Sequence, residues 1–280
     1  MKNEEKEIRL PTEYEKSEIQ SMKKWEQDPP GVMNRALGKA LVPVSWIAQK
    51  VIPKKAIEGC LNLANAAGSA LADKGDILRD GGVSNISDLR NVKMEVCDKL
   101  ANSVHNYALS FAAVEGGATG FFGLVGMAID IPSLITFALR SIHKIGLCYG
   151  FEAVSYEDEK YIFGIMAAAG ANNPTEKMTA IATMRSIQQI LVKTTWKKMA
   201  ETAAQKTFSK EAGIIAIRNL AKQLGINITK RKALQAIPLL GAGVGAGMNV
   251  QYINDVCWAA RREFQRRWLQ ENCVEIECER

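Results

Sequence analysis

A chain of 280 residues with 47% hydrophobic residues and a formal net charge of +6 is long enough to bury a sizeable core. Alternating runs of Val, Ile and Thr are nearly absent, while Ala, Leu, Ile, Met and Lys dominate. This pattern excludes a β-rich fold and predicts an all-α protein. The first thirty residues are charged and lack the apolar segment of a signal peptide, so we expect the chain to start in the cytoplasm. The six cysteines have no CxxC spacing, which predicts reduced and mostly buried thiols.

The N-terminal part of the sequence predicts helices that are separated by helix breakers. Thr12 and Glu15 have the spacing of a capping box and predict a helix that ends before Pro29-Pro30. The stretch Lys74–Asn85, KGDILRDGGVSN, predicts a loop, and we place a domain boundary there. The predicted units are an N-terminal helical segment (1–74), a helical domain (75–272) and a flexible tail (273–280).

Three longer helices are predicted in the following part of the chain. From Ser87 to Phe111, apolar residues recur every three or four positions, which is typical of an amphipathic helix. Ser155 is a suitable N-cap for a helix whose first turn is acidic. The turn residues Asn172-Asn173-Pro174 precede a predicted helix over Thr175–Lys206.

The stretch from Phe111 to Gly150 is apolar, dense in glycine and interrupted once, by Asp130-Ile131-Pro132. Every third residue from Gly117 to Gly126 is glycine. In a helix these residues would form a ridge on which another backbone can pack closely. Asp130 suits a helix N-cap and Pro132 suits a first turn. We therefore predict a tight helical hairpin with Asp130 at its corner.

A second stretch, Ala236–Arg267, resembles the first. With an offset of 121 positions, Gly120 aligns with Gly241, Gly126 with Gly247, and Arg140 with Arg261. Two interpretations remain open: an internal repeat that gives two hairpins packed on each other, or a similarity of composition alone. The predicted fold is a helical bundle built around two glycine-rich apolar hairpins.

Neither stretch reads as a standard transmembrane helix, which needs about twenty predominantly apolar residues. The uncharged run over Gly116–Ile129 has fourteen residues, and the run over Ala233–Asn254 has twenty-two but includes several amides and a proline. One alternative is a soluble bundle with buried hairpins. The other is that the hairpins contact or enter the bilayer, anchored by Lys230-Arg231-Lys232 and the C-terminal arginines.

The positive charge is concentrated between Arg185 and Lys232, where eleven Lys and Arg face two Glu. Such a segment favours an acidic partner, either anionic lipid head groups or nucleic acid, unless these residues are only solvated helix faces. The sequence contains no recognisable motif of a nucleic-acid-binding domain, so nucleic acid is the less favoured partner. The predicted basic surface comprises Arg185, Lys193, Lys197, Lys230, Arg231 and Lys232.

Residues with catalytic or metal-binding chemistry are few. The two histidines, His105 and His143, come without an HExxH motif or a Cys/His cluster, so we expect no metal and no cofactor. Glu115 and Asp130 are weak candidates for an acid–base pair. Asp130 is already explained as a helix cap, and Glu115 is better explained by an ion pair with Arg140 or Arg261. We therefore predict a protein that is not an enzyme.

Several motifs act together as a signature: Glu115-Gly116 with the spaced glycines, Asp130-Ile131-Pro132, Leu139-Arg140-Ser141-Ile142, Tyr149-Gly150-Phe151, and Ile237–Asn249 with Arg261 and Phe264. In these motifs the sequence resembles the EcsC family of bacterial proteins, roughly over residues 87–270. The family is named for a protein encoded beside an ABC transporter. The resemblance implies a bacterial, helical, membrane-associated protein and implies no mechanism. The motif residues we carry forward are Glu115, Gly116, Gly120, Gly126, Asp130, Pro132, Arg140, Gly241, Gly247, Asn249 and Arg261.

The favoured function is a non-enzymatic, membrane-associated accessory protein that acts on an envelope or transport complex or on the bilayer. One alternative is a membrane-acting effector of a stress or phage-defence system. The other is a hydrolase-like enzyme that uses Glu115 and Asp130. The expected partner is an anionic membrane surface or a membrane protein complex. The expected location is the cytoplasm, including the inner face of the cell membrane.

Overall fold

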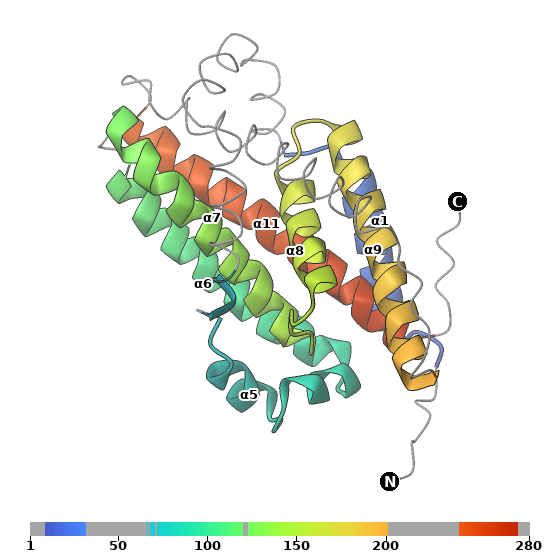
Figure 1. The fold of residues 1–280 in the computed structure, drawn as a ribbon. Coiled ribbons are helices and arrows are strands. Elements are labelled where there is room, and N and C mark those ends of the chain that lie inside the picture. The colour runs from blue at the N-terminus through green and yellow to red at the C-terminus, as the bar shows by residue number, and fades with distance from the viewer. Residues whose placement is uncertain are drawn as a thin grey trace.

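The computed structural model describes residues 9–31, 66, 68–70, 72–119, 123–200 and 241–273 (Figure 1). The described residues contain no strand, only an isolated bridge between Arg9 and Cys273. The predicted all-α class is therefore confirmed. The elements are α1 (Glu13–Gln27), α5 (Gly75–Gly81), the short 3-10 helix η1 (Ile86–Asn91), α6 (Met94–Thr119), α7 (Gly123–Cys148), α8 (Tyr156–Ala169), α9 (Pro174–Ala200) and α11 (Gly241–Asn272).

Helix α11 crosses the middle of the helical body, with α6 and α7 to one side and α8, α9 and α1 to the other (Figure 1). It packs on α6, α7, α8 and α1. The large side chains of Tyr252 and Trp268 are almost fully buried, and Trp268 donates its indole N–H to the carbonyl of Leu89 at 3.2 Å. Burial of so much apolar surface along one helix makes α11 the centre of the core.

The capping signals at the starts of α1 and α8 are confirmed, whereas the helix predicted from Ser87 is divided at Val92-Lys93 into η1 and α6. The Thr12 hydroxyl accepts from the amide of Glu15 at 3.2 Å, and the Glu15 carboxylate accepts from the amide of Thr12 at 2.7 Å. Ser155 and Asp158 form the same reciprocal cap at the start of α8. Helix α9 begins at Pro174, as the turn residues predicted. Caps are predictable because donor and acceptor lie within one turn of each other.

The predicted loop at Lys74–Asn85 is wrong, because Gly75–Gly81 forms α5 and residue Gly82 ends it at φ +64°. The carboxylate of Asp73 accepts from the amide of Gly75 at 2.9 Å, and Ile77 is buried. These contacts outweigh the low helix propensity of the glycines. Helix α1 also packs into the same body as α11. The domain boundary at residues 74–75 stays a prediction.

Two parts of the first predicted hairpin have different outcomes. Helices α6 and α7 run antiparallel, with the rings of Phe111 and Phe137 stacked at 4.5 Å between centroids. However, α7 runs without a break through Asp130-Ile131-Pro132, so Asp130 is not at a corner. Helix α6 ends at Thr119 and α7 begins at Gly123, and Gly120 lies outside the described residues. The glycine ridge is therefore divided between two helices.

The second predicted hairpin is wrong over its described part. Gly241–Asn272 is one continuous helix, and residues 236–240 lie outside the described residues. Gln251, which the offset of 121 aligns with the expected corner at Asp130, lies inside this helix, and no proline follows Gly241 in the sequence. An added Cβ at Gly247 would meet nothing within 4 Å, so this glycine does not permit a close backbone contact.

Two further predictions concern the state of the cysteines and the presence of a membrane-spanning helix. The described cysteines Cys97, Cys148, Cys257 and Cys273 are free and buried, as expected, whereas Cys60 and Cys278 lie outside the described residues. Among the described residues, every helix is too short or too polar to span a lipid bilayer.

Substitution of Gly150 and of Gly247 by alanine tests which of the two glycines the fold requires. Gly150 has φ +84°, and an added Cβ would lie 2.6 Å from Cγ and 2.9 Å from the backbone N of Arg90. We expect Gly150→Ala to reduce the free energy of unfolding by at least about 2 kcal/mol. Gly247→Ala should raise it by up to about 1 kcal/mol, because alanine is the better helix former. Urea unfolding followed by circular dichroism measures both, and an equal effect of the two changes would contradict this assignment.

Candidate functional site

The arginines at the C-terminal half of α11 point into the helical body. Arg262 pairs with Glu18 of α1 at 2.5 Å, and Arg267 pairs with Asp158 of α8 at 3.2 Å. Arg266 pairs with Glu26 of α1. The sequence suggested that these arginines anchor the protein on a membrane. These three arginines are engaged with internal carboxylates, so their charges are neutralised within the protein, and the membrane anchor stays a prediction.

A buried carboxylate on α6 joins four segments of the chain. Asp98 accepts hydrogen bonds from the hydroxyls of Tyr149 and Tyr14, the latter at 2.7 Å, and from Nε2 of Gln265 at 2.7 Å. Burial raises the pKa of Asp98, and the three donors partly offset this effect. We call this group the Asp98 hub, comprising Tyr14, Asp98, Tyr149 and Gln265. It fixes α1 and the end of α7 to the pair formed by α6 and α11.

Three contacts define the register between α6 and α11, which run antiparallel. Gln265 meets Asp98, Arg261 donates to Oδ1 of Asn102 at 3.2 Å, and the ring of Trp258 lies edge-on to His105 at 5.4 Å. Glu115 is thirteen residues beyond Asn102, or about 20 Å along the helix axis. The predicted ion pair between Glu115 and Arg261 does not fit this register.

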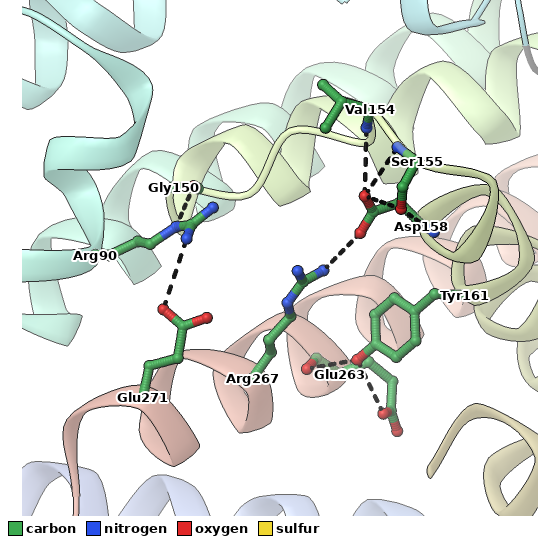
Figure 2. A network of polar contacts seen from close by, with 9 residues as sticks. All are labelled: Arg90, Gly150, Val154, Ser155, Asp158, Tyr161, Glu263, Arg267 and Glu271. Carbon is green, nitrogen blue, oxygen red and sulfur yellow. Dashed lines mark hydrogen bonds and ion pairs between the residues drawn. The ribbon is translucent and has the colours of Figure 1, made fainter. Parts of the chain in front are cut away.

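Figure 2 shows how the segment after α7 is held in place. Arg90 donates from Nε to the carbonyl of Gly150 at 2.7 Å and pairs with Glu271 at 3.9 Å. The guanidinium carbons of Arg90 and Arg267 lie 4.7 and 4.2 Å from the ring centroid of Phe151. The motif Tyr149-Gly150-Phe151 therefore has a structural role, since its residues contact charged groups of three other elements.

Glu263 is a fully buried carboxyl group on α11. The Tyr161 hydroxyl donates to its backbone carbonyl at 3.0 Å and lies 3.4 Å from Oε2 (Figure 2). Nε of Arg266 is 3.8 Å away. Burial raises the pKa of Glu263 to about 7, and the positive charge of Arg185 acts in the opposite direction. This group is poised to exchange a proton near neutral pH.

A cleft of about 150 Å³ lies between α5, α6 and α7. Arg140 lines it and lies over the ring of Tyr107 at 6.0 Å, while Lys144 pairs with Asp76 at 2.6 Å. The two serine hydroxyls in its lining donate to helix carbonyls, Ser103 at 3.2 Å and Ser141 at 2.9 Å. The lining residues include the carboxylates of Asp76 and Asp80 and contain no histidine or cysteine among the described residues.

One exposed face of α6 carries three large apolar side chains beside the exposed residues Ser103 and Ser110. Tyr107, Phe111 and Val114 are 58%, 43% and 76% exposed and follow one another at spacings of four and three residues. We call these three residues the α6 stripe. No charged residue occurs in the sequence between Lys99 and Glu115. The stripe leads along α6 toward the end of the body where the chain reverses into α7 (Figure 1).

The two histidines do not meet. His105 lies at 3.1 Å from Oδ1 of Asn254 on α11, whereas His143 lines a small cleft beside Asp158 and Tyr161 of α8. Burial lowers the pKa of both to about 4, with the charge of Arg261 adding to the effect at His105. Among the side chains that are described, no three His, Cys, Asp or Glu residues gather as a metal site would require.

The remaining predicted residues fall into two groups. Arg185 pairs with Glu26 at 2.5 Å, so its charge is not free for a basic surface, and Asn249 is buried. The following predictions lie outside the described residues or side chains: Glu115, Gly116, Gly120, Gly126, Asp130, Pro132, Lys193, Lys197, Lys230, Arg231, Lys232 and Gly241.

With this architecture in place, the relationship to known proteins can be stated. The chain belongs to the EcsC protein family, whose family model matches residues 16–269. The match begins within α1, well before the expected start near residue 87. The chain is also 22% identical over 197 residues to the uncharacterized protein YdbA of Bacillus subtilis (strain 168), which covers 70% of this chain. The match spans 66% of that relative, slightly less than two thirds of its length. No solved structure matches the chain.

The pKa of Glu263 predicts a specific pH dependence of stability. Between its ordinary value of 4.5 and about 7, folded Glu263 holds a proton that the unfolded chain releases. The free energy of unfolding therefore falls as pH rises through this range. Glu263→Gln removes this contribution, so relative to wild type it should gain on the order of 2 kcal/mol between pH 5 and pH 8.

Urea unfolding at both pH values measures this difference. Glu271→Gln, which removes a partly exposed carboxylate from the same helix, is the matched control and should keep the wild-type pH dependence. A Glu263→Gln protein whose stability varies with pH as the wild type does would show that Glu263 does not titrate in this range.

Proposed function

We propose that this protein is a non-enzymatic accessory protein that binds the surface of a lipid bilayer reversibly through the α6 stripe and the apolar sequence that follows it. The observation that carries the proposal is the exposure of Tyr107, Phe111 and Val114 on a helix face without charge. Residues 116–129, GGATGFFGLVGMAI, extend the uncharged sequence directly from this helix. An aromatic residue with a polar tip, such as Tyr107, suits the interface between lipid and water.

The proposed contact is apolar rather than electrostatic. Arg262, Arg266 and Arg267 are paired with internal carboxylates, and Arg185 is paired with Glu26. Binding should therefore depend weakly on salt and on the anionic lipid content of the membrane. This differs from a polybasic segment, whose attraction falls within a Debye length of the surface.

The free energy gained by burying the apolar side chains of the α6 stripe in lipid is small enough for reversible binding. Transfer of one exposed apolar side chain of this size out of water is worth about 1–2 kcal/mol. Three such side chains give a few kcal/mol, which resembles the marginal affinity of a single acyl chain. A protein held in this way exchanges between membrane and solution, as an accessory factor of an envelope or transport complex would.

The alternative of a hydrolase has less support: the side chains of its expected residues, Glu115 and Asp130, lie outside the described part of the structure, and polar groups of the cleft are engaged. Lys144 is neutralised by Asp76, and the Ser141 hydroxyl is engaged with a helix carbonyl. A membrane-acting effector remains the nearer alternative, because it would use the same apolar surface. The two differ in outcome: an effector permeabilises the bilayer, whereas an accessory protein binds without releasing vesicle contents.

Vesicle flotation tests the proposal with a matched pair of variants. Val114 and Val154 are both exposed, at 76% and 85%, but Val154 lies in the segment before α8. We expect Val114→Ser to reduce binding to phosphatidylcholine vesicles several-fold, by the loss of about 1 kcal/mol of apolar transfer. Val154→Ser should bind as the wild type does, and binding should change little with added NaCl.

Equal binding of Val114→Ser and Val154→Ser would contradict a contact through the α6 stripe, and so would no binding of the wild type. Circular dichroism spectra of each variant control for folding. Release of an encapsulated dye in the same samples would favour the effector over the accessory protein.

A further inference from the structure

The cleft between α5, α6 and α7 has charges of opposite sign on two of its walls. Among its described lining residues, α5 supplies the carboxylates of Asp76 and Asp80, whereas α7 supplies the cations Arg140 and Lys144. Most of the remaining lining is apolar and comes from all three helices, as with Phe137 of α7. A ligand that matches these walls carries a negative and a positive group close together, next to an apolar part.

These four charges are not equally engaged within the protein. Lys144 is 13% exposed and pairs with Asp76 at 2.6 Å, which ties α7 to α5. Asp80 is 54% exposed, and its partner Arg79 on the same helix is 75% exposed. An ion pair between two such exposed side chains contributes little, and a carboxylate can accept from more than one donor. Asp80 is therefore able to receive a second cation from the cleft.

The cleft is continuous with the α6 stripe. Phe137 lines the cleft and stacks on Phe111 of the stripe, with 4.5 Å between ring centroids. Tyr107 belongs to both surfaces, and the guanidinium of Arg140 lies over its ring at 6.0 Å. A molecule bound in the cleft would thus contact the same exposed aromatic residue through which we propose that the protein meets a bilayer.

Polarity along this surface changes in the same order as it does across one leaflet of a bilayer. The pair Phe111 and Phe137 is apolar, Tyr107 one turn away on α6 has a polar tip, and Lys144 lies one turn beyond Arg140 on α7. Tyrosine prefers the interface between lipid and water, and long cationic side chains extend toward the head groups. The rise from Arg140 to Lys144 is about 6 Å, which matches a head-group layer of roughly 5–7 Å.

The size of the cleft selects a head group rather than a whole lipid. A space of about 150 Å³ takes a group of about the size of a benzene ring. The polar head of one phospholipid is of this order, whereas its acyl chains are much larger. The chains would therefore remain outside the cleft, in the bilayer that the α6 stripe contacts.

We propose that the cleft between α5, α6 and α7 binds the zwitterionic head group of one phospholipid, with the phosphate beside Arg140 and the ammonium group beside Asp80. The inference rests on the proposed function, because the α6 stripe would bring the cleft to the head-group layer. A guanidinium matches the oxygens of a phosphate well. A head group with only negative charge would lie close to Asp76 and Asp80 without an ammonium group to compensate, and is therefore disfavoured.

Calorimetric titration of the full chain with short-chain lipids below their micelle concentration tests the site without a membrane. We expect saturable binding of dihexanoylphosphatidylethanolamine, several-fold tighter than that of dihexanoylphosphatidylglycerol, which has the same chains but no ammonium group. Asp80→Asn should abolish this preference by weakening the binding of the zwitterionic lipid alone. Arg140→Gln should weaken the binding of both lipids several-fold, because both contain the phosphate.

Two exposed residues that do not line the cleft provide matched controls. Glu159→Gln removes a carboxylate from α8, and Lys99→Gln removes a cation from α6. Both variants should keep the affinity and the preference of the wild type. The preference is tested by Asp80→Asn, a change at an exposed position, so the test holds even if Arg140→Gln fails to fold.

Equal affinity of the wild type for the two lipids would overturn the proposal, and so would a preference that survives in Asp80→Asn. Vesicle flotation separates this result from the proposed membrane contact. A wild type that floats with vesicles but does not bind the monomeric zwitterionic lipid keeps the α6 stripe and refutes the head-group site. A wild type that binds this lipid with the expected preference but does not float supports the site and refutes the membrane contact.

Discussion

The pairing of buried arginines on α11 with carboxylates from other helices is the constraint on which this fold depends. A guanidinium inside a protein needs a counterion, and Arg262 and Arg266 find theirs on α1, while Arg267 finds Asp158 on α8. Removal of one partner would leave a buried charge without compensation. The central helix therefore holds the N-terminal helix by charge as well as by packing, which agrees with a family match that begins at residue 16.

The sequence was sufficient for local structure and insufficient for long-range structure. The caps at Thr12 and Ser155 were predictable because all of their atoms lie within one helical turn. The structure around Asp130 could not be predicted in this way. An aspartate followed closely by proline is typical of a helix start, but it also fits inside a helix whose neighbouring turns are packed, as in α7. Leu134, Ile135 and Leu139 of α7 are buried, and that packing outweighs the local signal.

The candidate sites were harder to predict than the helices. The run RREFQRR reads as a solvated helix face, and nothing nearby in sequence identifies Glu18 as the partner of Arg262, 244 residues away. The apolar periodicity over Ser87–Phe111 predicted a buried face, and the outcome is mixed. Leu89 and Leu100 are buried, whereas Tyr107 and Phe111 are exposed. Periodicity identifies the apolar side of a helix but not how far along that side another helix covers it. At Tyr107 and Phe111 the cover is incomplete.

Helix α6 brings the features of this molecule into one rigid element. Asp98 lies near its start, Asn102 one turn later, and the α6 stripe follows over the next three turns, all within about 25 Å. Asn102 and Arg261 belong to two helices, and the hydrogen bond from Nη1 of Arg261 to Oδ1 of Asn102 at 3.2 Å holds α6 and α11 at one spacing. The same spacing is set one turn away by Gln265 and Asp98. Because a helix moves as one body, a change at either position would also shift the exposed aromatic residues relative to α11. The polar contacts that α6 makes with α11 and the exposed α6 stripe are therefore physically connected through one helix, although they lie on different sides of it.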